Sequence, residues 1–116
     1  HQQIPEMTVV GHNTATIRES LLEKAFELGE KFITASKEHY DPGIIGPFCL
    51  QTCIDKDMNY AIYDVAPRLG GGTNVHVSVG HPYGNATWRK PVSSGRRIAM
   101  ELRRAVEQDR LLEVLT

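Results

Sequence analysis

Apolar residues recur at helical spacing through the first third of this chain. Between residues 17 and 35 they follow one another at intervals of three or four, which places them on one face of an amphipathic helix. Thr16 and Glu19 have capping-box spacing at the helix start, and Asp41-Pro42-Gly43 is expected to end the helix. The stripe consists of Ile17, Leu21, Ala25, Leu28, Phe32 and Ala35.

A β-hairpin is expected next. Strand-forming residues dominate two segments that flank turn residues 55–59. In the expected register Asp55 pairs with Tyr60, which places Gln51 opposite Asp64. The two expected strands span residues 44–54 and 60–65. Alternation of side chains assigns Gln51, Cys53, Ile62 and Asp64 to one face, and Phe48, Leu50, Ile54, Ala61 and Tyr63 to the other.

The second half of the chain predicts a short strand and a final helix. Residues 75–79 form a short apolar stretch that includes His76, and residues 80–85 have the composition of a turn. Ser93-Ser94-Gly95 precedes the expected helix. The resulting order predicts an α+β fold in which helices back an antiparallel sheet. The apolar positions of the last helix are Ile98, Leu102, Ala105, Val106 and Leu112.

The length of the chain suits one domain or one large subdomain. Residues 1–14 are interpreted as an incoming linker or edge strand, with a short strand over residues 7–10. Residues 15–116 are interpreted as a single α+β subdomain with a core of modest size.

The balance of charges argues against nucleic acid as a partner. The chain has 13 Lys and Arg residues against 14 Asp and Glu residues, whereas nucleic-acid-binding domains carry a basic excess. No apolar run approaches the ~18 residues that span a bilayer, so no membrane partner is expected. Cys49 and Cys53 would lie roughly 13 Å apart along a strand, too far for a disulfide. Both are therefore expected to be small apolar filler in a reducing cytoplasm.

The segment from Asp64 to Asn74 combines residues that suit a metal and nucleotide site. Asp64 lies near the end of a strand, Arg68 follows it, and three glycines come next. A carboxylate can hold Mg²⁺, an arginine can bind a phosphate through two parallel hydrogen bonds, and glycines let backbone amides approach an anion. The segment lacks the Lys-Ser/Thr pair of a P-loop. The alternative interpretation is a buried ion pair between Asp64 and Arg68 beside a flexible loop.

This arrangement of two strands followed by an acid and an arginine is similar to the C-terminal part of the ATP-grasp ligases. In that superfamily the first strand carries one metal ligand, and the second ends in a Glu-x-Asn-x-Arg pattern. Longer strings resemble the archaeal formate-dependent formaminoimidazole-carboxamide ribonucleotide synthetases, from about Thr8 to Thr116. Those strings are Arg18-Glu19-Ser20-Leu21-Leu22, Gly43-Ile44-Ile45-Gly46-Pro47-Phe48-Cys49-Leu50-Gln51, Gly72-Thr73-Asn74 and Ser94-Gly95-Arg96-Arg97-Ile98-Ala99.

The resemblance implies an ATP- and Mg²⁺-dependent ligase of purine biosynthesis, with Mn²⁺ as an alternative ion. ATP activates formate to formyl phosphate, and the amine of the aminoimidazole-carboxamide ribonucleotide attacks it, with release of ADP and phosphate. The implied small-molecule substrates are therefore ATP, formate and that ribonucleotide. The implied protein partners are the N-terminal remainder of the enzyme and further copies in a homo-oligomer, in the cytoplasm.

The resemblance also implies a role for individual residues. Asp64 matches the main metal ligand, and Gln51 matches a weaker or water-mediated one. Arg68 matches the catalytic arginine that faces the γ-phosphate or the acyl phosphate. Nucleotide or substrate binding is implied for a wider set at the starts of the two long helices and at the glycine loop, which is the segment around Gly70, Gly71 and Gly72. That set comprises Gly72, Thr73, Asn74, Arg18, Glu19 and Arg96.

Three positions depart from the superfamily pattern. Ala66 stands where the pattern has asparagine, Asp64 replaces glutamate, and Gln51 is an amide. Two other functions therefore stay open, namely a non-catalytic nucleotide-binding or regulatory module and an oligomerisation module. The chain by itself is expected to bind ATP weakly and to turn nothing over. His76 is interpreted as a strand-packed side chain and His81 as a loop side chain, rather than as general bases.

Overall fold

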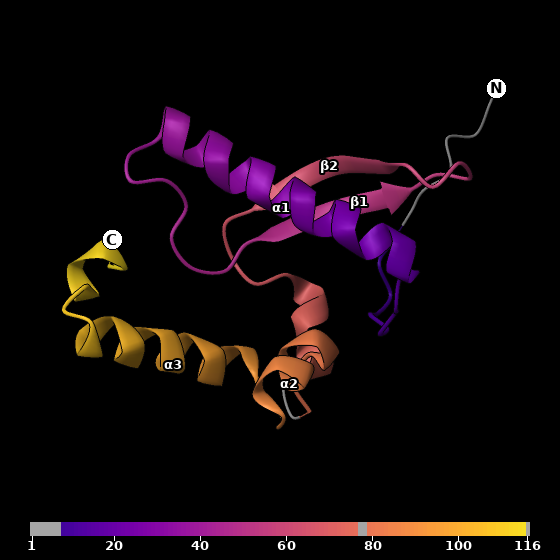
Figure 1. Cartoon of the computed structure of the whole chain (residues 1–116). Helices are drawn as coiled ribbons and strands as arrows, with labels where there is room; N and C mark the ends of the chain where they lie inside the picture. Colours follow the sequence, from indigo (N-terminus) through magenta and orange to yellow (C-terminus); the bar gives the residue numbers. More distant parts are fainter. Residues whose placement is uncertain (1–7, 77–78, 116) are drawn as a thin grey trace.

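The computed structural model describes residues 8–76 and 79–115 (Figure 1). Within these residues a two-stranded antiparallel sheet is accompanied by three α-helices, so the α+β prediction is confirmed. Helix α1 crosses one face of the sheet, and α3 runs apart from both. The elements are α1 (Glu19–His39), β1 (Cys49–Ile54), β2 (Tyr60–Ala66), η1 (Gly71–His76), α2 (Pro82–Trp88), α3 (Ser94–Glu107) and η2 (Leu111–Glu113), where η denotes a 3-10 helix.

Helix α1 confirms the predicted stripe but not the predicted start. The N-cap residue is Arg18, which makes no side-chain capping bond, and the Leu21 amide donates to the Arg18 carbonyl at 2.9 Å. The first turn therefore begins after Thr16, and the capping-box prediction is wrong. The helix ends at Tyr40, whose extended backbone directs the chain away immediately before Asp41, as predicted. Leu21 is the buried residue of the stripe, with 5% of its surface exposed.

The hairpin pairs Gln51 with Asp64, which confirms that part of the predicted register. Near the turn Ile54 pairs with Tyr60, so the predicted pairing of Asp55 with Tyr60 is wrong. The register shifts by one residue between the two regions, and Tyr63 is left without a partner as a β-bulge.

The bulge also changes two of the predicted face assignments. On the turn side of the bulge Ile62 pairs with Thr52, and Ala61 pairs with Cys53. Ile62 therefore lies on the opposite face from Cys53, and Ala61 on the same face, which reverses both predictions. Bulges cannot be counted from strand composition alone, so an alternating pattern keeps its predicted faces only up to the inserted residue.

Helix α1 packs on the face of the sheet that carries Tyr60. The Tyr60 hydroxyl donates a hydrogen bond to the Leu21 carbonyl at 3.0 Å. Farther along, the rings of Phe32 and Phe48 lie 5.0 Å apart between centroids. Because Gln51 and Asp64 alternate with the residues on the α1 side, they lie on the opposite face of the hairpin.

Two predictions for the middle of the chain are wrong. Residues 71–76 form the 3-10 helix η1, so the strand expected over residues 75–79 does not begin there, and residues 77–78 lie outside the described residues. The turn expected over residues 80–85 is replaced by α2, whose first residue is Pro82. Proline at the first helical position has a backbone angle that suits a helix start, which explains this outcome. The strand expected over residues 7–10 is also absent from residues 8–10, and Met7 is not described.

Helix α3 begins earlier than predicted, because Ser94 and Gly95 belong to it, and it ends earlier than its apolar pattern. Ser93 caps it by accepting a hydrogen bond from the Arg96 amide at 3.3 Å. The helix ends at Glu107, so Leu112 belongs to the separate 3-10 helix η2. Ala105 is buried, whereas Ile98 and Leu102 keep 38% and 37% of their surfaces exposed.

The fold is open for a chain of this size. Its accessible surface is 9893 Å², whereas a compact monomer of 13.0 kDa exposes about 6,300 Å². The radius of gyration is 16.8 Å, against about 13 Å for a compact domain of similar length. No helix of the described residues is both long and apolar enough to cross a membrane. In the described part of the chain only Leu21, Ala66, Val92 and Ala105 are buried hydrophobic residues.

Truncation of Leu21 tests the contact between α1 and the sheet. Leu21→Ala is expected to lower the free energy of unfolding by about 2–3 kcal/mol, because it removes a buried side chain and leaves a cavity. Phe26→Ala on the same helix is the control, since Phe26 is 59% exposed and its loss is expected to cost under ~0.5 kcal/mol. Urea denaturation followed by circular dichroism measures both. Equal losses would contradict the packing described for α1.

Asp55 makes the hairpin turn sensitive to acid. Its pKa lies below the ordinary value of 3.8, because the Asn59 backbone amide, then the Asn59 side chain and the Asp57 amide, donate to the carboxylate. A lowered folded-state pKa stabilises the fold above the unfolded value, so this stability is lost as the pH falls below 3.8. Thermal unfolding over a pH series is expected to show this loss in the wild type and a smaller loss in Asp55→Asn. Identical acid profiles would exclude Asp55 as the source.

Candidate functional site

Gln51 and Asp64 form the first part of the candidate site. They are direct partners across the hairpin, and the Gln51 side-chain amide donates to the Asp64 carboxylate with Nε2 and Oδ2 2.5 Å apart. Gln51 is half-buried and Asp64 is exposed, on the face turned away from α1. Asp64 therefore remains reachable from solvent, and its neighbour supplies a second oxygen if the amide rotates.

Arg68 does not form the ion pair with Asp64 that the alternative interpretation requires. Its guanidinium donates to the Leu69 carbonyl, with Nη1 and the oxygen 2.9 Å apart, and the side chain is exposed. In the described residues the salt bridges involve other arginines. A buried Asp64–Arg68 pair is therefore wrong as an explanation of this segment, and both charges stay available to other groups.

The glycine loop meets the start of α3 at a cavity of about 520 Å³. One wall comes from the loop and includes Arg68 and Thr73, and the other is the segment Ser93-Ser94-Gly95. The first amides of a helix have no partner within the helix, and they carry partial positive charge. The structure therefore brings a guanidinium, a threonine and free amides together around one space, as anion binding requires.

Close approach explains two of the glycines in this loop. A Cβ at Gly70 would lie 2.9 Å from the Cys49 sulfur, and a Cβ at Gly71 would lie 3.2 Å from the His12 ring. Cys49 thus packs against the loop as the predicted filler. Cys53 is exposed, so the filler prediction is wrong for it, and both cysteines are free as expected.

His12 is the site neighbour that the sequence did not reveal. It belongs to the segment before α1, yet its imidazole lies against Gly71 and near Gly72. No spacing or motif links residue 12 to this loop, because the contact depends on the path of the chain between them. His12 is exposed, so it can meet a ligand at the edge of the glycine loop.

The remaining predicted residues are dispersed. Arg18 and Glu19 are exposed at the start of α1, and neither lines the cavity at the glycine loop. Arg96 is exposed on the first turn of α3, and it too is absent from the cavity wall. Gly72 and Asn74 lie in η1, where the Asn74 side chain is outside the described residues.

His76 and His81 contact each other, although His76 lies in η1 rather than in the expected strand and His81 precedes α2. The rings of His76 and His81 lie 4.8 Å apart in an edge-on arrangement, and His81 also lies 5.3 Å from the Tyr83 ring. Burial lowers the pKa of His81 below its ordinary value of 6.5, and repulsion from His76 lowers it further. Both effects favour the neutral form of the His81 imidazole.

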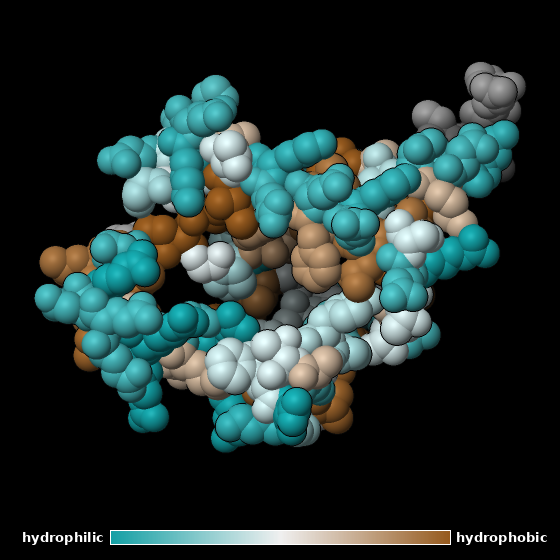
Figure 2. Space-filling model, viewed as in Figure 1, coloured by the Kyte–Doolittle hydropathy of each residue, from teal (hydrophilic) through white to brown (hydrophobic). Residues whose placement is uncertain are grey.

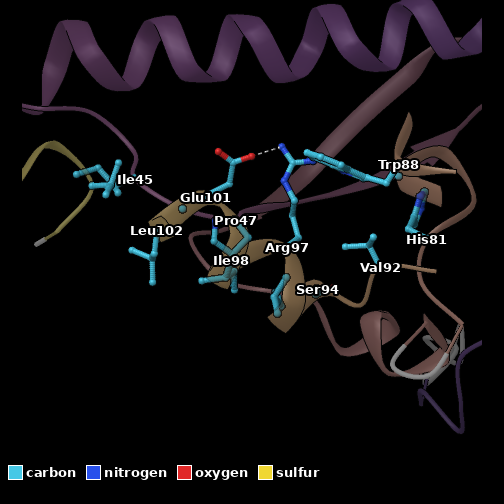
Figure 3. A pocket seen from close by; sticks show the side chains of 14 residues that line it. Ile45, Pro47, His81, Trp88, Val92, Ser94, Arg97, Ile98, Glu101 and Leu102 are labelled. Carbon is cyan, nitrogen blue, oxygen red and sulfur yellow. Dashed lines mark ion pairs between the residues drawn. The ribbon is translucent and has the colours of Figure 1, made fainter. Parts of the chain in front are cut away.

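A second, more apolar cavity of about 580 Å³ lies between α2, α3 and the segment before β1 (Figure 3). Arg97 stacks on Trp88, with its guanidinium carbon 5.3 Å from the ring centroid. Arg97 also forms a 2.6 Å salt bridge with Glu101 one turn farther along α3. The remaining wall is mainly aliphatic, so this space differs in chemistry from the cavity at the glycine loop.

The donors for a metal ion are few. The described residues contain no group of three or more His, Cys, Asp or Glu side chains that could hold a metal. Gln51 and Asp64 provide two adjacent side chains with oxygen donors, which suits Mg²⁺ when phosphate oxygens and water complete the shell. The residues present therefore fit a metal that arrives with a nucleotide better than a metal held by protein alone.

The class of this chain follows from its match to a described protein family. The model for "Domain of unknown function (DUF1297)" matches residues 1–116, so the chain belongs to this family. Among solved structures, an IMP biosynthesis protein PurP from Thermococcus kodakaraensis superposes with a TM-score of 0.79 and 40% sequence identity. That match covers 94% of this chain and 35% of the other.

Curated relatives are archaeal synthetases. The 5-formaminoimidazole-4-carboxamide-1-(beta)-D-ribofuranosyl 5'-monophosphate synthetase of Thermococcus kodakarensis is 44% identical over 114 residues, which are 96% of this chain and 33% of that protein. The synthetase of the same name from Saccharolobus solfataricus is 42% identical over 112 residues, 97% of this chain and 33% of that protein. The predicted resemblance to the archaeal synthetases is confirmed, and the chain spans about a third of the length of these relatives.

The exposure of Asp64 predicts how its substitution affects the fold. Asp64→Asn is expected to change the free energy of unfolding by less than ~0.5 kcal/mol, because no salt bridge of the described residues depends on this carboxylate and asparagine keeps an acceptor for Gln51. Urea denaturation of the variant beside the wild type measures the change. A loss of more than ~2 kcal/mol in the free energy of unfolding would indicate that Asp64 forms a structural ion pair.

Proposed function

We propose that this chain is one part of an ATP- and Mg²⁺-dependent ligase of the ATP-grasp superfamily. The complete enzyme formylates the aminoimidazole-carboxamide ribonucleotide with formate, in the synthesis of purines. A formate oxygen attacks the γ-phosphorus of ATP, which forms formyl phosphate and expels ADP. The ribonucleotide amine then attacks the formyl carbon, and phosphate leaves as the amine loses a proton.

The observation that carries this proposal is the similarity to the archaeal synthetases along 96–97% of the chain. Identities of 42–44% over more than a hundred residues exceed what a shared fold alone requires. The positions of the candidate residues add support, because Gln51 and Asp64 are neighbours on the sheet face opposite α1.

This chain's own residues would bind and orient the phosphates. Arg68 carries a permanent charge that can stabilise the negative charge on the transferred phosphoryl group. Thr73 and the amides at the start of α3 line the same cavity as Arg68 and can hold phosphate oxygens. Positioning and charge stabilisation are the main protein contributions to phosphoryl transfer, so these residues suit the task.

Asp64 and Gln51 would hold the divalent ion, Mg²⁺ or in its place Mn²⁺. When bound, the ion neutralises charge on the nucleotide phosphates and orients them. Asp64 supplies the charged ligand, and Gln51 supplies a neutral oxygen directly or through water. The amide hydrogen bond from Gln51 keeps the carboxylate in place while the ion is absent.

Ala66 favours the second candidate, a nucleotide-binding or regulatory module without catalysis. It lies on the same sheet face as Asp64 and Gln51, and it is buried with 7% of its surface exposed. At this motif position the superfamily pattern places an asparagine oxygen, whereas Ala66 offers only a methyl group. A weakened metal set of this kind could retain nucleotide binding and lose turnover.

Release of ADP by a chimera tests the ligase proposal. This chain replaces the matching third of the Thermococcus kodakarensis synthetase, and the chimera receives Mg²⁺-ATP, formate and the aminoimidazole-carboxamide ribonucleotide. ADP release is expected to require both formate and the ribonucleotide, and Asp64→Asn is expected to lower kcat by at least ~100-fold through loss of the charged ligand. Asp57→Asn is the matched control, because Asp57 is an exposed aspartate in the turn of the same hairpin.

The chain alone provides the second arm of this experiment. The 116-residue chain is expected to release no ADP above background, since the adenine pocket of the proposed enzyme lies outside it. A chimera that binds ATP without releasing ADP would favour the regulatory module. Full activity of Asp64→Asn in an active chimera would remove Asp64 from the site.

A further inference from the structure

The apolar cavity beside α3 is lined by apolar side chains that stay partly exposed. The α2–α3 groove is defined here by Ile45, Pro47, Trp88, Ile98 and Leu102, which all line the 580 Å³ cavity. Figure 2 shows the molecule hollowed between the layer of α1 with the sheet and the layer of α3, with apolar side chains mainly on the side of α1 and the sheet. Ile98 and Leu102 project from α3 at the cavity, and more than a third of each remains exposed (Figure 3).

Exposure of this apolar groove to water is unfavourable in free energy. Exposed apolar area costs about 25 cal/mol per Å², so contiguous apolar side chains favour burial against a partner. The indole N–H of Trp88 is already buried within the chain and has no acceptor among the described residues, so an occupant meets only the apolar part of the Trp88 side chain.

The amount of exposed surface distinguishes between occupants. The chain exposes roughly 3,500 Å² more than a compact monomer of its mass. A standard protein–protein interface covers only about 800 Å² on each partner, so one copy of this chain docked on another would leave most of the excess uncovered. A longer polypeptide can cover more of this surface than a second copy, and the relatives are about three times as long as the segment that matches this chain.

We propose that the α2–α3 groove is a docking site for the other two-thirds of a polypeptide as long as these synthetases. This inference rests on the proposed function, since it takes the missing partner from the length of those relatives. The occupant inserts an aliphatic or aromatic side chain beside Ile98, Leu102 and Pro47. The Arg97–Glu101 pair, about half exposed, lies at the rim and stays paired there.

Cysteine labelling at α3 tests this inference. Ile98→Cys and Leu102→Cys are made in the 116-residue chain and in the full-length chimera with the Thermococcus kodakarensis synthetase. A bulky maleimide is applied, and labelling is read site by site with mass spectrometry, so that Cys49 and Cys53 do not interfere. Arg103→Cys is the matched control on the same helix, because Arg103 is exposed and does not line the groove.

Both groove cysteines are expected to react at least about 10-fold more slowly in the chimera than in the isolated chain, as burial by a stable partner requires. Arg103→Cys is expected to react at the same rate in both. Equal rates at the groove positions would overturn the inference. Protection of the isolated chain that grows with its concentration would also overturn it, because a second copy would then be the occupant.

The same chimera separates this inference from the proposed function. An active chimera with unprotected groove cysteines would overturn the docking surface and leave the ligase proposal standing. A chimera without ligase activity but with protected groove cysteines would support the docking surface and count against the ligase proposal. Circular dichroism of each variant confirms that the helices are retained before labelling is compared.

Discussion

The packing of α1 against one face of the β1–β2 hairpin organises the rest of this chain. Leu21 is buried in that contact, and its carbonyl accepts the Tyr60 hydroxyl, so one residue joins the helix to the sheet through both apolar and polar interactions. A two-stranded sheet is marginal in water without such a cover. Because the helix occupies one face, the other face is left for Gln51 and Asp64.

The bulge at Tyr63 allows β2 to pair in two different registers, one near the turn and one at Asp64. Near the turn, the register that pairs Tyr60 with Ile54 directs Tyr60 toward α1. If that register continued, Tyr63 rather than Asp64 would lie opposite Gln51. The extra residue restores the pairing of the carboxylate with the amide, which is the kind of local adjustment for which bulges are used near functional sites.

The path of the chain between the sheet and α3 explains both the open fold and the cavity at the candidate site. The glycine loop, η1 and α2 lead the chain away from the sheet, and α3 returns only its first turn to the loop. This path creates the small cavity around Arg68 and leaves the apolar side of α3 uncovered. A chain with so few buried residues obtains little stability from its own contacts, so a covering partner would contribute to its fold as well as to any site.

The sequence by itself determined the features that depend on local spacing. The stripe of α1 and the stop before Asp41 follow from periodicity and turn chemistry within a few residues. Gln51 does pair with Asp64 as predicted, but the predicted turn pairing is wrong, and the bulge at Tyr63 restores the match. The motif from Asp64 to Arg68 and the longer strings were sufficient to indicate the family. Local patterns were misleading at residues 75–85, where short apolar and glycine-rich stretches suit strand, turn and helix alike.

Only the tertiary structure decided which distant segments meet. His12 against Gly71, Trp88 beneath Arg97, and the glycine loop beside Ser94 join residues that no periodicity connects. The absence of an Asp64–Arg68 ion pair from the described residues was likewise decided by side-chain direction, not by spacing. The physical reason is that local spacing specifies which face a residue occupies, whereas the partner of that face depends on how the whole chain closes loops and excludes water.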